Sequence, residues 1–424
     1  MDPARTAART RLRPAMRAAA GAWMLSSSAD VFLVFALLWL AEPQGWSGAQ
    51  TALLILATRL PLLVGGVVGG RAVDRFGPRA MILVDGVVRT AVLGVLALSA
   101  RDGSLELRLV ILLTALAGIT QPLSYAGART LVVRYEPPHL RARANALLAL
   151  GDQLPLVLAA AFLGAALTAF GVSATMAVPA ALMLGVAAIA VLLPRGDGQD
   201  HRARADSAGT ASPAPKTGSS PWRVPGVKAL VALSVAYYAA YGPFEPALPS
   251  FVRDDLGGEA DAYGVVWTAF GIGALATVVL APRLSRWRPG VVNAVGAAVW
   301  GLVTLPLVLL DSVPAAAALM LVSGAVWGPY AAIEATALQQ WTPPERHGRL
   351  FGTQRALLAT AAPLGAAVGA LALNVTEPAV VLAVSALACT AAGLVTLTRP
   401  GIQRRAAPVA PPSRSRSAER DLST

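Results

Sequence analysis

Charged side chains that interrupt long apolar stretches are the residues of this chain whose types and positions could do chemistry. Asp30 and Arg59 fall near the middle of two such stretches, and Asp152, Glu245 and Glu334 fall within three others. A charge at the centre of a bilayer costs about 2.5–3.5 kcal/mol, so in a membrane protein each of these groups should face the interior. A buried carboxylate there can bind and release a proton or contact a polar solute. The five residues are therefore candidates for coupling protons to the movement of a solute.

Asp30 and Arg59 lie at similar depths on consecutive apolar stretches, which predicts an ion pair between them. Protonation of Asp30 would then release Arg59 and change the balance between two conformations. A permanent buried pair that fixes helix register is the structural alternative. Glu245, which lies between two prolines, could be a gate or a solute contact, or an acid hydrated in an outer vestibule. Glu334 could contact the solute or pair with a neighbouring basic residue, and for Asp152 a structural and a coupling role are both open.

A second acid–base pair lies within a single apolar stretch. Asp85 and Arg89 have the i, i+4 spacing that places two side chains on one face of a helix. The spacing therefore predicts a local ion pair. A structural or gating role is favoured for this pair over contact with a solute.

The elements that must position these residues are membrane-spanning helices. Of the 424 residues, 55% are hydrophobic and only 14% are charged, and the mean hydropathy is +0.60. Such a composition excludes an ordinary soluble domain. Apolar stretches long enough to cross a bilayer alternate with short polar connectors. Twelve spans are predicted, at residues 18–41, 47–70, 80–100, 108–128, 145–169, 173–193, 227–251, 262–281, 291–310, 314–339, 351–373 and 378–397.

The charges of the connectors set the orientation of these spans. All but five of the 35 Lys and Arg residues fall in every second connector or at the two ends of the chain, whereas the intervening connectors are neutral or acidic. By the positive-inside rule, the basic connectors and both termini are cytoplasmic. The net charge of +12 is then loop charge at the inner leaflet, and no nucleic-acid partner is expected. We expect a multi-pass protein of the inner, or cytoplasmic, cell membrane.

The two sets of six spans repeat each other. Residues 118–143 align without a gap on residues 324–349, which places Arg143 on Arg349. Two six-helix halves of the same orientation form a parallel repeat, with a binding site expected near the midplane between them. The predicted organisation is all-α: a cytoplasmic N-terminal segment (1–17), a six-helix half (18–193), a flexible cytoplasmic linker (194–225), a second six-helix half (226–398) and a disordered cytoplasmic tail (399–424).

The chain resembles the major facilitator superfamily at the connector between its second and third spans. The stretch from Gly69 to Arg79, Gly-Gly-Arg-Ala-Val-Asp-Arg-Phe-Gly-Pro-Arg, is similar to that family's signature of a glycine followed by Asp-Arg-x-Gly and a basic pair. The resemblance implies the major facilitator fold and a conformational latch at this end of the protein. The residues that it assigns to this gating signature, together with the acid–base pair above, are Gly70, Asp74, Arg75, Gly77, Arg79, Asp85 and Arg89.

More narrowly, the chain is similar to the branch that contains macrolide-efflux proteins and the enterobactin exporter. Ser28-Ala-Asp30, Arg59-Leu-Pro61 and Pro363-Leu-Gly365 are among the residues that carry this likeness, which implies proton antiport. Two features depart from the family pattern. Pro78 stands where the signature usually has a basic residue, and the glycine-proline motif of span five is reduced to Ala159-Ala-Ala-Phe-Leu-Gly164. The direction of transport and its coupling to protons therefore stay open at this point.

Gln121, Trp327 and Tyr330 lie well inside the paired fourth and tenth spans and are candidates for lining a solute pocket. Trp and Tyr near span ends more often form an interfacial belt or pack between helices. The sequence contains no P-loop, its three histidines lack metal-ligand spacing, and Cys389 has no second cysteine with which to pair. No nucleophile–base arrangement occurs in the spans. We therefore expect no cofactor, no metal and no enzymatic activity.

Together these features predict a secondary active transporter. We expect proton-coupled efflux of a small amphipathic or hydrophobic compound (a drug, antibiotic, siderophore or secondary metabolite) by rocking of one half on the other. The expected partners are the small-molecule substrate, protons and the lipid bilayer, and the protein is expected to be a monomer. Uptake or uniport of a polar nutrient is one alternative. A transport-dead sensor or scaffold with the same fold is another.

Overall fold

The computed structural model describes residues 12–102, 104–194, 221–342 and 347–404. Most of the predicted N-terminal segment (1–17), linker (194–225) and tail (399–424) therefore lies outside the described residues. Within the described part of the chain the secondary structure is helical and contains no strand. The predicted all-α class is confirmed for these residues.

The helices follow the predicted spans closely, because apolar runs and prolines at the first turn decide where most of them begin. The first bundle contains α2 (Pro14–Leu40), α3 (Gly48–Arg59), α4 (Pro61–Phe76), α5 (Pro78–Ser99), α6 (Leu107–Tyr135) and α7 (Pro138–Leu192). The second bundle contains η1 (Pro221–Arg223), α9 (Val227–Tyr241), α10 (Phe244–Asp254), α11 (Ala260–Val278), α12 (Ala281–Leu284), α13 (Pro289–Thr304), η2 (Leu305–Leu309), α14 (Val313–Trp327), α15 (Tyr330–Trp341), α16 (His347–Ala372) and α17 (Pro378–Leu397).

Several predicted spans are interrupted near proline, which has no backbone N–H with which to continue the hydrogen-bond ladder. Pro61 follows the junction of α3 and α4, Pro243 lies between α9 and α10, and Pro329 lies between α14 and α15. The break between α9 and α10 is the one expected from the prolines that bracket Glu245. Such breaks allow two helix segments to change their mutual angle more easily than a continuous helix.

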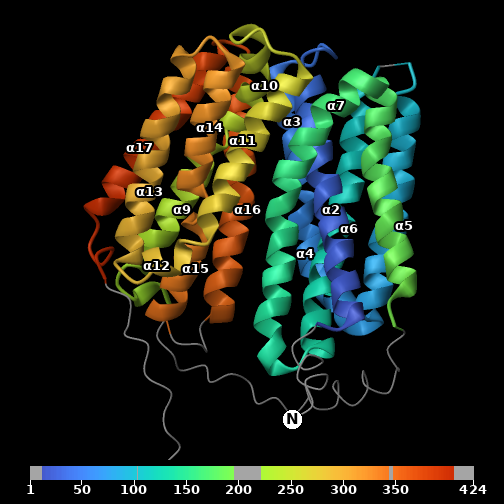
Figure 1. Cartoon of the computed structure of the whole chain (residues 1–424), viewed down its shortest axis with the longest axis horizontal. Coiled ribbons are helices and arrows are strands. Elements are labelled where there is room, and N and C mark those ends of the chain that lie inside the picture. Colours follow the sequence, from blue (N-terminus) through green and yellow to red (C-terminus); the bar gives the residue numbers. More distant parts are fainter. Residues whose placement is uncertain (1–11, 103, 195–220, 343–346, 405–424) are drawn as a thin grey trace, which may run out of the picture.

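The helix α7 contains two predicted spans and reverses direction between them. At Gly171 the backbone has φ 71° and ψ −177°, a conformation that residues with a Cβ rarely adopt. Figure 1 shows both limbs of α7 running from a turn at the top of the view toward the opposite end of the molecule. A single glycine therefore produces the hairpin.

Two helical bundles lie side by side, with α2–α7 in one and α9–α17 in the other (Figure 1). The bundles join where α16 packs on α3, α11 on α7 and α10 on α2. The contact between α3 and α16 brings two backbones together. A Cβ on Gly48 would lie 1.9 Å from the Ala370 carbonyl oxygen, and the Gly48 N–H donates to the side-chain oxygen of Asn374 at 2.8 Å.

Further contacts between the bundles involve the loop end of α2. The Arg253 guanidinium of α10 pairs with the Glu42 carboxylate, donates to the Trp39 carbonyl oxygen at 3.0 Å and lies 4.4 Å from the centroid of the Trp39 ring system. Trp39 also stacks on Tyr263 of α11, with ring centroids 5.4 Å apart. An ion pair, a hydrogen bond and two ring contacts thus hold the bundles together here.

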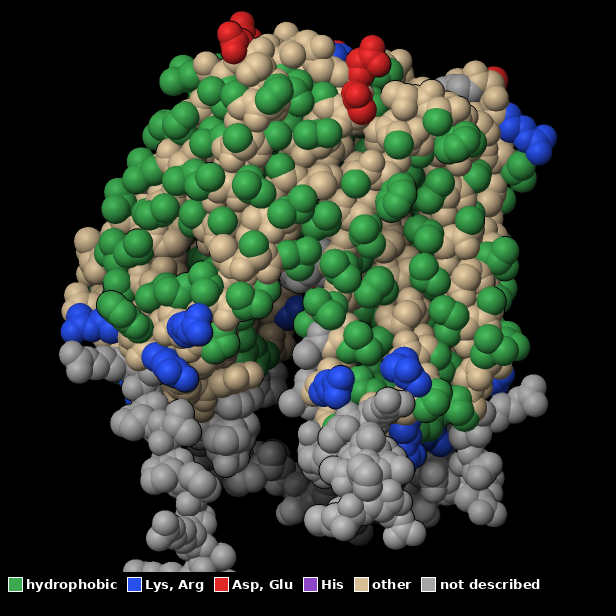
Figure 2. Space-filling model, in the orientation of Figure 1, with side chains coloured by type: hydrophobic (Ala, Val, Ile, Leu, Met, Phe, Trp, Pro, Cys, Tyr) green, Lys and Arg blue, Asp and Glu red, His purple; other side chains and the backbone are tan. Residues whose placement is uncertain are grey.

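The surface has a broad hydrophobic band between two ends of different charge (Figure 2). The basic end carries Arg75, Arg283 and Arg399, and the acidic end carries Glu42, Asp311 and Glu377. At the basic end the surface is hollowed between the two bundles (Figure 2), whereas Arg253 pairs with Glu42 at the acidic end. On the face shown in Figure 2, the bundles are therefore in contact at the acidic end and separated by a hollow at the basic end.

Ten helices in the described part of the chain are long and apolar enough to cross a membrane. The two limbs of α7 count once among them, although the helix turns at Gly171. The helices α9 and α10, with 15 and 11 residues, are each too short to be counted. The chain is a multi-pass membrane protein, and both the count of twelve spans and the cytoplasmic position of the termini stay predictions.

Within the second bundle, α11 and α14 approach each other through glycines. A Cβ on Gly324 would lie 1.9 Å from the Phe270 carbonyl oxygen, and one on Gly273 would lie 2.0 Å from the Leu321 carbonyl oxygen. Close packing through small residues is a main source of helix association in membranes, where lipid removes the hydrophobic driving force between helices.

We expect Gly324→Val to destabilise the protein, because the new side chain must push the α11 backbone away, and overpacking costs about 1–3 kcal/mol. The measurement is the fraction of detergent-solubilised protein that stays monodisperse after heating, from which an apparent Tm is obtained. Gly296→Val on α13 is the matched control, since nothing lies within 4 Å of a Cβ at that position. An equal Tm for the two variants would contradict the close approach of α11 and α14.

Candidate functional site

Arg89 lies at the centre of the candidate site. Its guanidinium pairs with the Asp30 carboxylate of α2 and with the Asp85 carboxylate one turn away on α5, the latter at 3.7 Å. The Arg89 side chain is 1% exposed and the Asp85 side chain 0%, whereas the Asp30 side chain is 23% exposed. The Asp85–Arg89 pair expected from the i, i+4 spacing is confirmed. One guanidinium therefore serves two carboxylates inside the first bundle.

The predicted ion pair between Asp30 and Arg59 is wrong. Arg59 lies at the end of α3 and extends toward the second bundle, where its Nη2 is 3.9 Å from Oε2 of Glu245. Asp30 instead pairs with Arg89, which lies two spans later in the chain. Similar depth on consecutive helices does not decide which face of each helix a side chain occupies. Arg89 and Glu245 are therefore the partners of Asp30 and Arg59, and their similar depth in the bilayer stays a prediction.

Neutral polar groups complete the surroundings of the two carboxylates and tie α2, α5 and α6 into one polar cluster. Gln121, which the sequence places among the pocket candidates, donates from its amide to Asp30. The hydrogen bonds of the cluster run from Gln121 to Asp30, from Ser124 to Asp85 at 2.5 Å, and from Arg89 Nη1 to the Ser26 hydroxyl at 3.0 Å.

A small cavity adjoins Asp30, and Arg89 is not among its lining residues. It has a volume of about 30 Å³ and is lined also by Thr58, Arg59 and Thr114. A polar site of this volume has room for one or two water molecules. Asp30 is thus the carboxylate of the cluster that a proton can reach most directly.

A second buried acid, Glu334, lies on α15 in the other bundle. Its Oε1 accepts a hydrogen bond from the Ser234 hydroxyl of α9 at 2.5 Å, and that hydroxyl lies 3.1 Å from the Tyr330 hydroxyl. Glu334 is 3% exposed. None of the basic side chains in the described ranges forms an ion pair with it. The pairing with a neighbouring basic residue that the sequence left open is therefore not found in this part of the chain.

Aromatic rings pack beside this acid, between α9, α14 and α15. The ring system of Trp327 has its centroid 5.3, 5.4 and 4.8 Å from those of Tyr237, Tyr238 and Tyr241. The Tyr330 ring lies 4.8 Å from that of Tyr237. Each such aromatic pair adds about 0.5–1.5 kcal/mol beyond the burial of apolar area. Trp327 and Tyr330 are thus members of a packed aromatic cluster rather than isolated pocket residues.

Asp152 belongs to a third polar cluster, nearer the basic end. Its carboxylate accepts hydrogen bonds from Trp23 Nε1 at 2.9 Å and from Arg129 Nη2 at 3.2 Å. Both Arg129 and Arg355 lie over the Tyr125 ring, at 4.2 and 4.3 Å from its centroid, and Arg355 donates to the Tyr125 hydroxyl at 2.6 Å. Arg355 is on α16, so this cluster connects the two bundles.

The surface part of the gating signature lies at the junction of α4 and α5. Gly77, with φ 86°, ends α4, and Arg79 donates to two carbonyl oxygens near the end of α7 at 3.1 and 3.0 Å. Arg75 lies over the ring of the adjacent Phe76, and Gly70 lies within α4. Asp74 is exposed and forms no ion pair with a described residue. The structure thus separates these residues from the buried Asp85 and Arg89 farther along α5.

Sequence reasoning missed several polar residues of these clusters. Ser26 lies four positions before Asp30, and Ser124 lies three positions after Gln121. Residues three or four apart share a helix face. A search for polar side chains at these spacings from each candidate site residue would have found both serines. No comparable pattern in the sequence predicts that Arg355 contacts the first bundle.

Comparison with known proteins places this geometry in a family. The sequence profile of the Major Facilitator Superfamily matches residues 18–340 and 230–422. The multidrug efflux pump Tap of Mycobacterium tuberculosis (strain ATCC 25618 / H37Rv) is 27% identical over 358 residues, which are 81% of this chain and 83% of that protein. The MFS-type transporter y4rN of Sinorhizobium fredii (strain NBRC 101917 / NGR234) is 25% identical over 373 residues, 87% of this chain and 89% of that protein.

Solved transporter structures have the same fold. The nucleoside transporter NupG superposes with a TM-score of 0.67 at 12% identity, over 91% of this chain and 98% of that one. A bacterial homologue of the human lysosomal transporter Spinster, inward-facing and occupied, superposes with a TM-score of 0.63 at 15% identity, over 94% of each chain. At these identities the likeness concerns the fold alone. The profile match covers most of the chain, which therefore belongs to the Major Facilitator Superfamily of membrane transporters.

Proposed function

We propose that this protein is a secondary active transporter that exports a small amphipathic or hydrophobic compound in exchange for protons. Relatives that are multidrug efflux pumps support the direction of transport. The observation that carries the coupling is the buried cluster in which Arg89 faces both Asp30 and Asp85. The family itself supports movement of a small molecule across the membrane.

Two carboxylates and one guanidinium leave this cluster with an excess negative charge when both acids are ionised. Such an excess is costly away from water, and one bound proton removes it. Asp30 is the favoured acceptor, because it is partly exposed and adjoins the small cavity whereas Asp85 is fully buried. Protonation weakens the attraction between Asp30 and Arg89 and so loosens α2 from α5. The same helix α2 reaches the second bundle at its acidic end, which links proton binding to contacts between the bundles.

We propose further that the bundles rock against each other. The described conformation is joined at the acidic end and hollow at the basic end. With the basic end in the cytoplasm, as the positive-inside rule predicts, this geometry is that of an inward-facing state. On this proposal each limb of α7 crosses the membrane once, as does the α9–α10 pair. Twelve spans and two cytoplasmic termini follow.

The substrate is proposed to bind between the bundles, where Arg59 of α3 faces Glu245 of α10. This pair is long, at 3.9 Å, and its side chains are 40% and 23% exposed, so it is weakly held. A polar group of the substrate can replace either partner. The aromatic cluster of Trp327 and Tyr330, with Glu334 beside it, would form the apolar wall of the site in the second bundle.

Asp30→Asn should uncouple transport, because an amide of nearly the same shape keeps one acceptor oxygen for Arg89 or Gln121 but cannot exchange a proton. In inside-out vesicles energised with a pH gradient, accumulation of an amphipathic fluorescent dye that the native protein transports should slow by about 5- to 150-fold, the usual range of a coupling free energy. Exchange of the dye across vesicles without a gradient should persist. Transport by the variant should also lose its dependence on pH.

Asp102→Asn, in an exposed loop at the acidic end, is the control for loss of a carboxylate and should transport like the native protein. An Asp30→Asn variant with native rate and native pH dependence would exclude Asp30 as the coupling group. Movement of the solute together with protons toward the cytoplasmic face would favour uptake instead of efflux. Dye binding without flux in the native protein would favour a sensor or scaffold.

Arg253→Ala should shift the protein away from the described conformation, because it removes an ion pair, a hydrogen bond and a cation–π contact at the acidic end. At an exposed site these together contribute about 1–2 kcal/mol. Spin labels at Ser104→Cys and Asp311→Cys, in a Cys389→Ala background, report the distance between the bundles at this end by pulsed electron resonance. The population with a longer distance should increase in the variant.

Arg108→Ala is the matched control, since Arg108 is an exposed arginine at the same end that forms no ion pair with a described residue. Its distance distribution should equal that of the labelled parent. If Arg253→Ala also leaves the distribution unchanged, the Arg253 contacts do not control separation of the bundles.

A further inference from the structure

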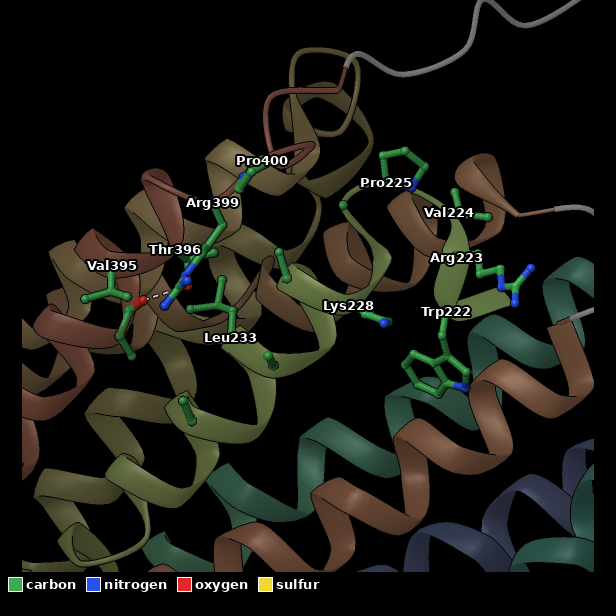
Figure 3. Close-up of a pocket in the computed structure, with 15 residues that line it drawn as sticks. Trp222, Arg223, Val224, Pro225, Lys228, Leu233, Val395, Thr396, Arg399 and Pro400 are labelled. Carbon is green, nitrogen blue, oxygen red and sulfur yellow. Dashed lines mark hydrogen bonds between the residues drawn. The ribbon is translucent and has the colours of Figure 1, made fainter. Parts of the chain in front are cut away.

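A groove at the basic end of the second bundle lies apart from the site described above. A cavity of about 690 Å³ is lined by η1, the first turns of α9 and the last turns of α17 (Figure 3). A second cavity of about 400 Å³ lies between α9 and α16. The two share Trp222, Lys228, Ala232 and Ala236. They therefore form one groove, with α9 as its floor and α16 and α17 as its walls.

The floor of the groove is apolar and open. Ala232 and Ala236 lie one turn apart on α9, and both are exposed although they are in a helix that is otherwise largely buried. Leu233 and Val395 add apolar surface on the side of α17, and Val235 adds it on the side of α16. An exposed apolar surface of this kind on the membrane-facing side of a protein is covered by lipid acyl chains.

The rim of the groove is basic. Figure 3 shows Arg399 on the α17 side, Arg223 on η1 and Lys228 between them on α9. All three side chains are exposed, and none forms an ion pair with a residue in the described ranges. Trp222 lines the groove together with Lys228, and indole rings favour the boundary between headgroups and acyl chains. The groove thus combines a cationic rim with an apolar floor.

Two glycines hold this rim together. Gly226 has φ 87° and Gly401 has φ 82°, and a Cβ on Gly226 would lie 2.5 Å from the Gly401 carbonyl oxygen. The turn before α9 and the turn after α17 therefore meet backbone to backbone. This contact places Arg223, which precedes α9, and Arg399, which follows α17, on the rim of one cavity, although they are far apart in the sequence.

We propose that this groove binds an anionic phospholipid of the leaflet at the basic end of the protein. The phosphodiester lies among Arg223, Lys228 and Arg399, and the acyl chains lie over Ala232 and Ala236. Basic pockets between membrane helices recognise lipid headgroups by this combination of charge and depth. A free phosphate would use the rim alone and leave the apolar floor uncovered. The lipid bound here packs on α9, α16 and α17 and lies outside the hollow between the bundles.

The test is native mass spectrometry of the full chain in detergent, titrated with phosphatidylglycerol or phosphatidylcholine of identical acyl chains. Phosphatidylglycerol should bind more tightly. In Lys228→Gln/Arg399→Gln its binding should weaken by about 10- to 30-fold, the effect of two cations at an anionic headgroup. Arg71→Gln/Arg283→Gln is the control: it removes two exposed arginines that do not line the groove and should bind phosphatidylglycerol like the native protein.

A second variant tests the apolar floor while keeping all three cations. Ala232→Leu/Ala236→Leu should lower phosphatidylglycerol binding and leave the protein monodisperse, because both positions are exposed. Soluble glycerol 1-phosphate should not compete at concentrations equal to those of the lipid. Equal binding of the two lipids, equal losses in the groove and control double variants, or full competition by glycerol 1-phosphate would each overturn the proposal. The last result would assign the rim to soluble phosphate.

Discussion

The cost of holding charge away from water is the constraint on which the first bundle depends. A guanidinium as deeply buried as that of Arg89 is tolerated only when acids and hydrogen-bond acceptors surround it. Those partners come from three helices, since Ser26 and Asp30 lie on α2 and Asp85 lies on α5, with Ser124 of α6 bound in turn to Asp85. The cluster therefore fixes how α2, α5 and α6 are rotated about their own axes. A change of charge at any one member of the cluster therefore changes the electrostatic interactions of all three helices.

At the corresponding repeat positions, the second bundle has side chains of a different chemical type. In the gapless alignment of residues 118–143 on residues 324–349, Gln121 corresponds to Trp327 and Ser124 corresponds to Tyr330. The first bundle uses these two positions to bind carboxylates, whereas the second uses them for closely packed aromatic rings. One backbone arrangement thus carries a polar cluster on one side of the molecule and an aromatic one on the other. The repeat preserves helix geometry and leaves side-chain chemistry free to differ.

Hydropathy and proline positions predicted most of the fold, because the bilayer requires long apolar helices and proline interrupts them wherever it occurs. The hairpin at Gly171 and the break before Glu245 both fall where the sequence places them. The candidate site was harder to predict. Asp30, Asp85 and Arg89 could be recognised singly as buried charges, but their meeting depends on the rotation of α2 against α5, which one sequence does not specify. The contact of Arg355 with Tyr125 depends on the position of one whole bundle against the other and leaves no local signal.

The backbone contact between Gly48 and Ala370 has a mechanical consequence. No side chain of α3 intervenes there, so the two helices can turn about this point without breaking an interlocked pair of side chains. Such a point serves as a fulcrum, and α16, with 26 residues, serves as its lever arm. A helix of that length extends about 39 Å. A rotation of about 15°, similar in size to known subunit rotations, would move its far end by about 10 Å. A contact between two atoms near the acidic end would in this way set the width of the opening at the basic end.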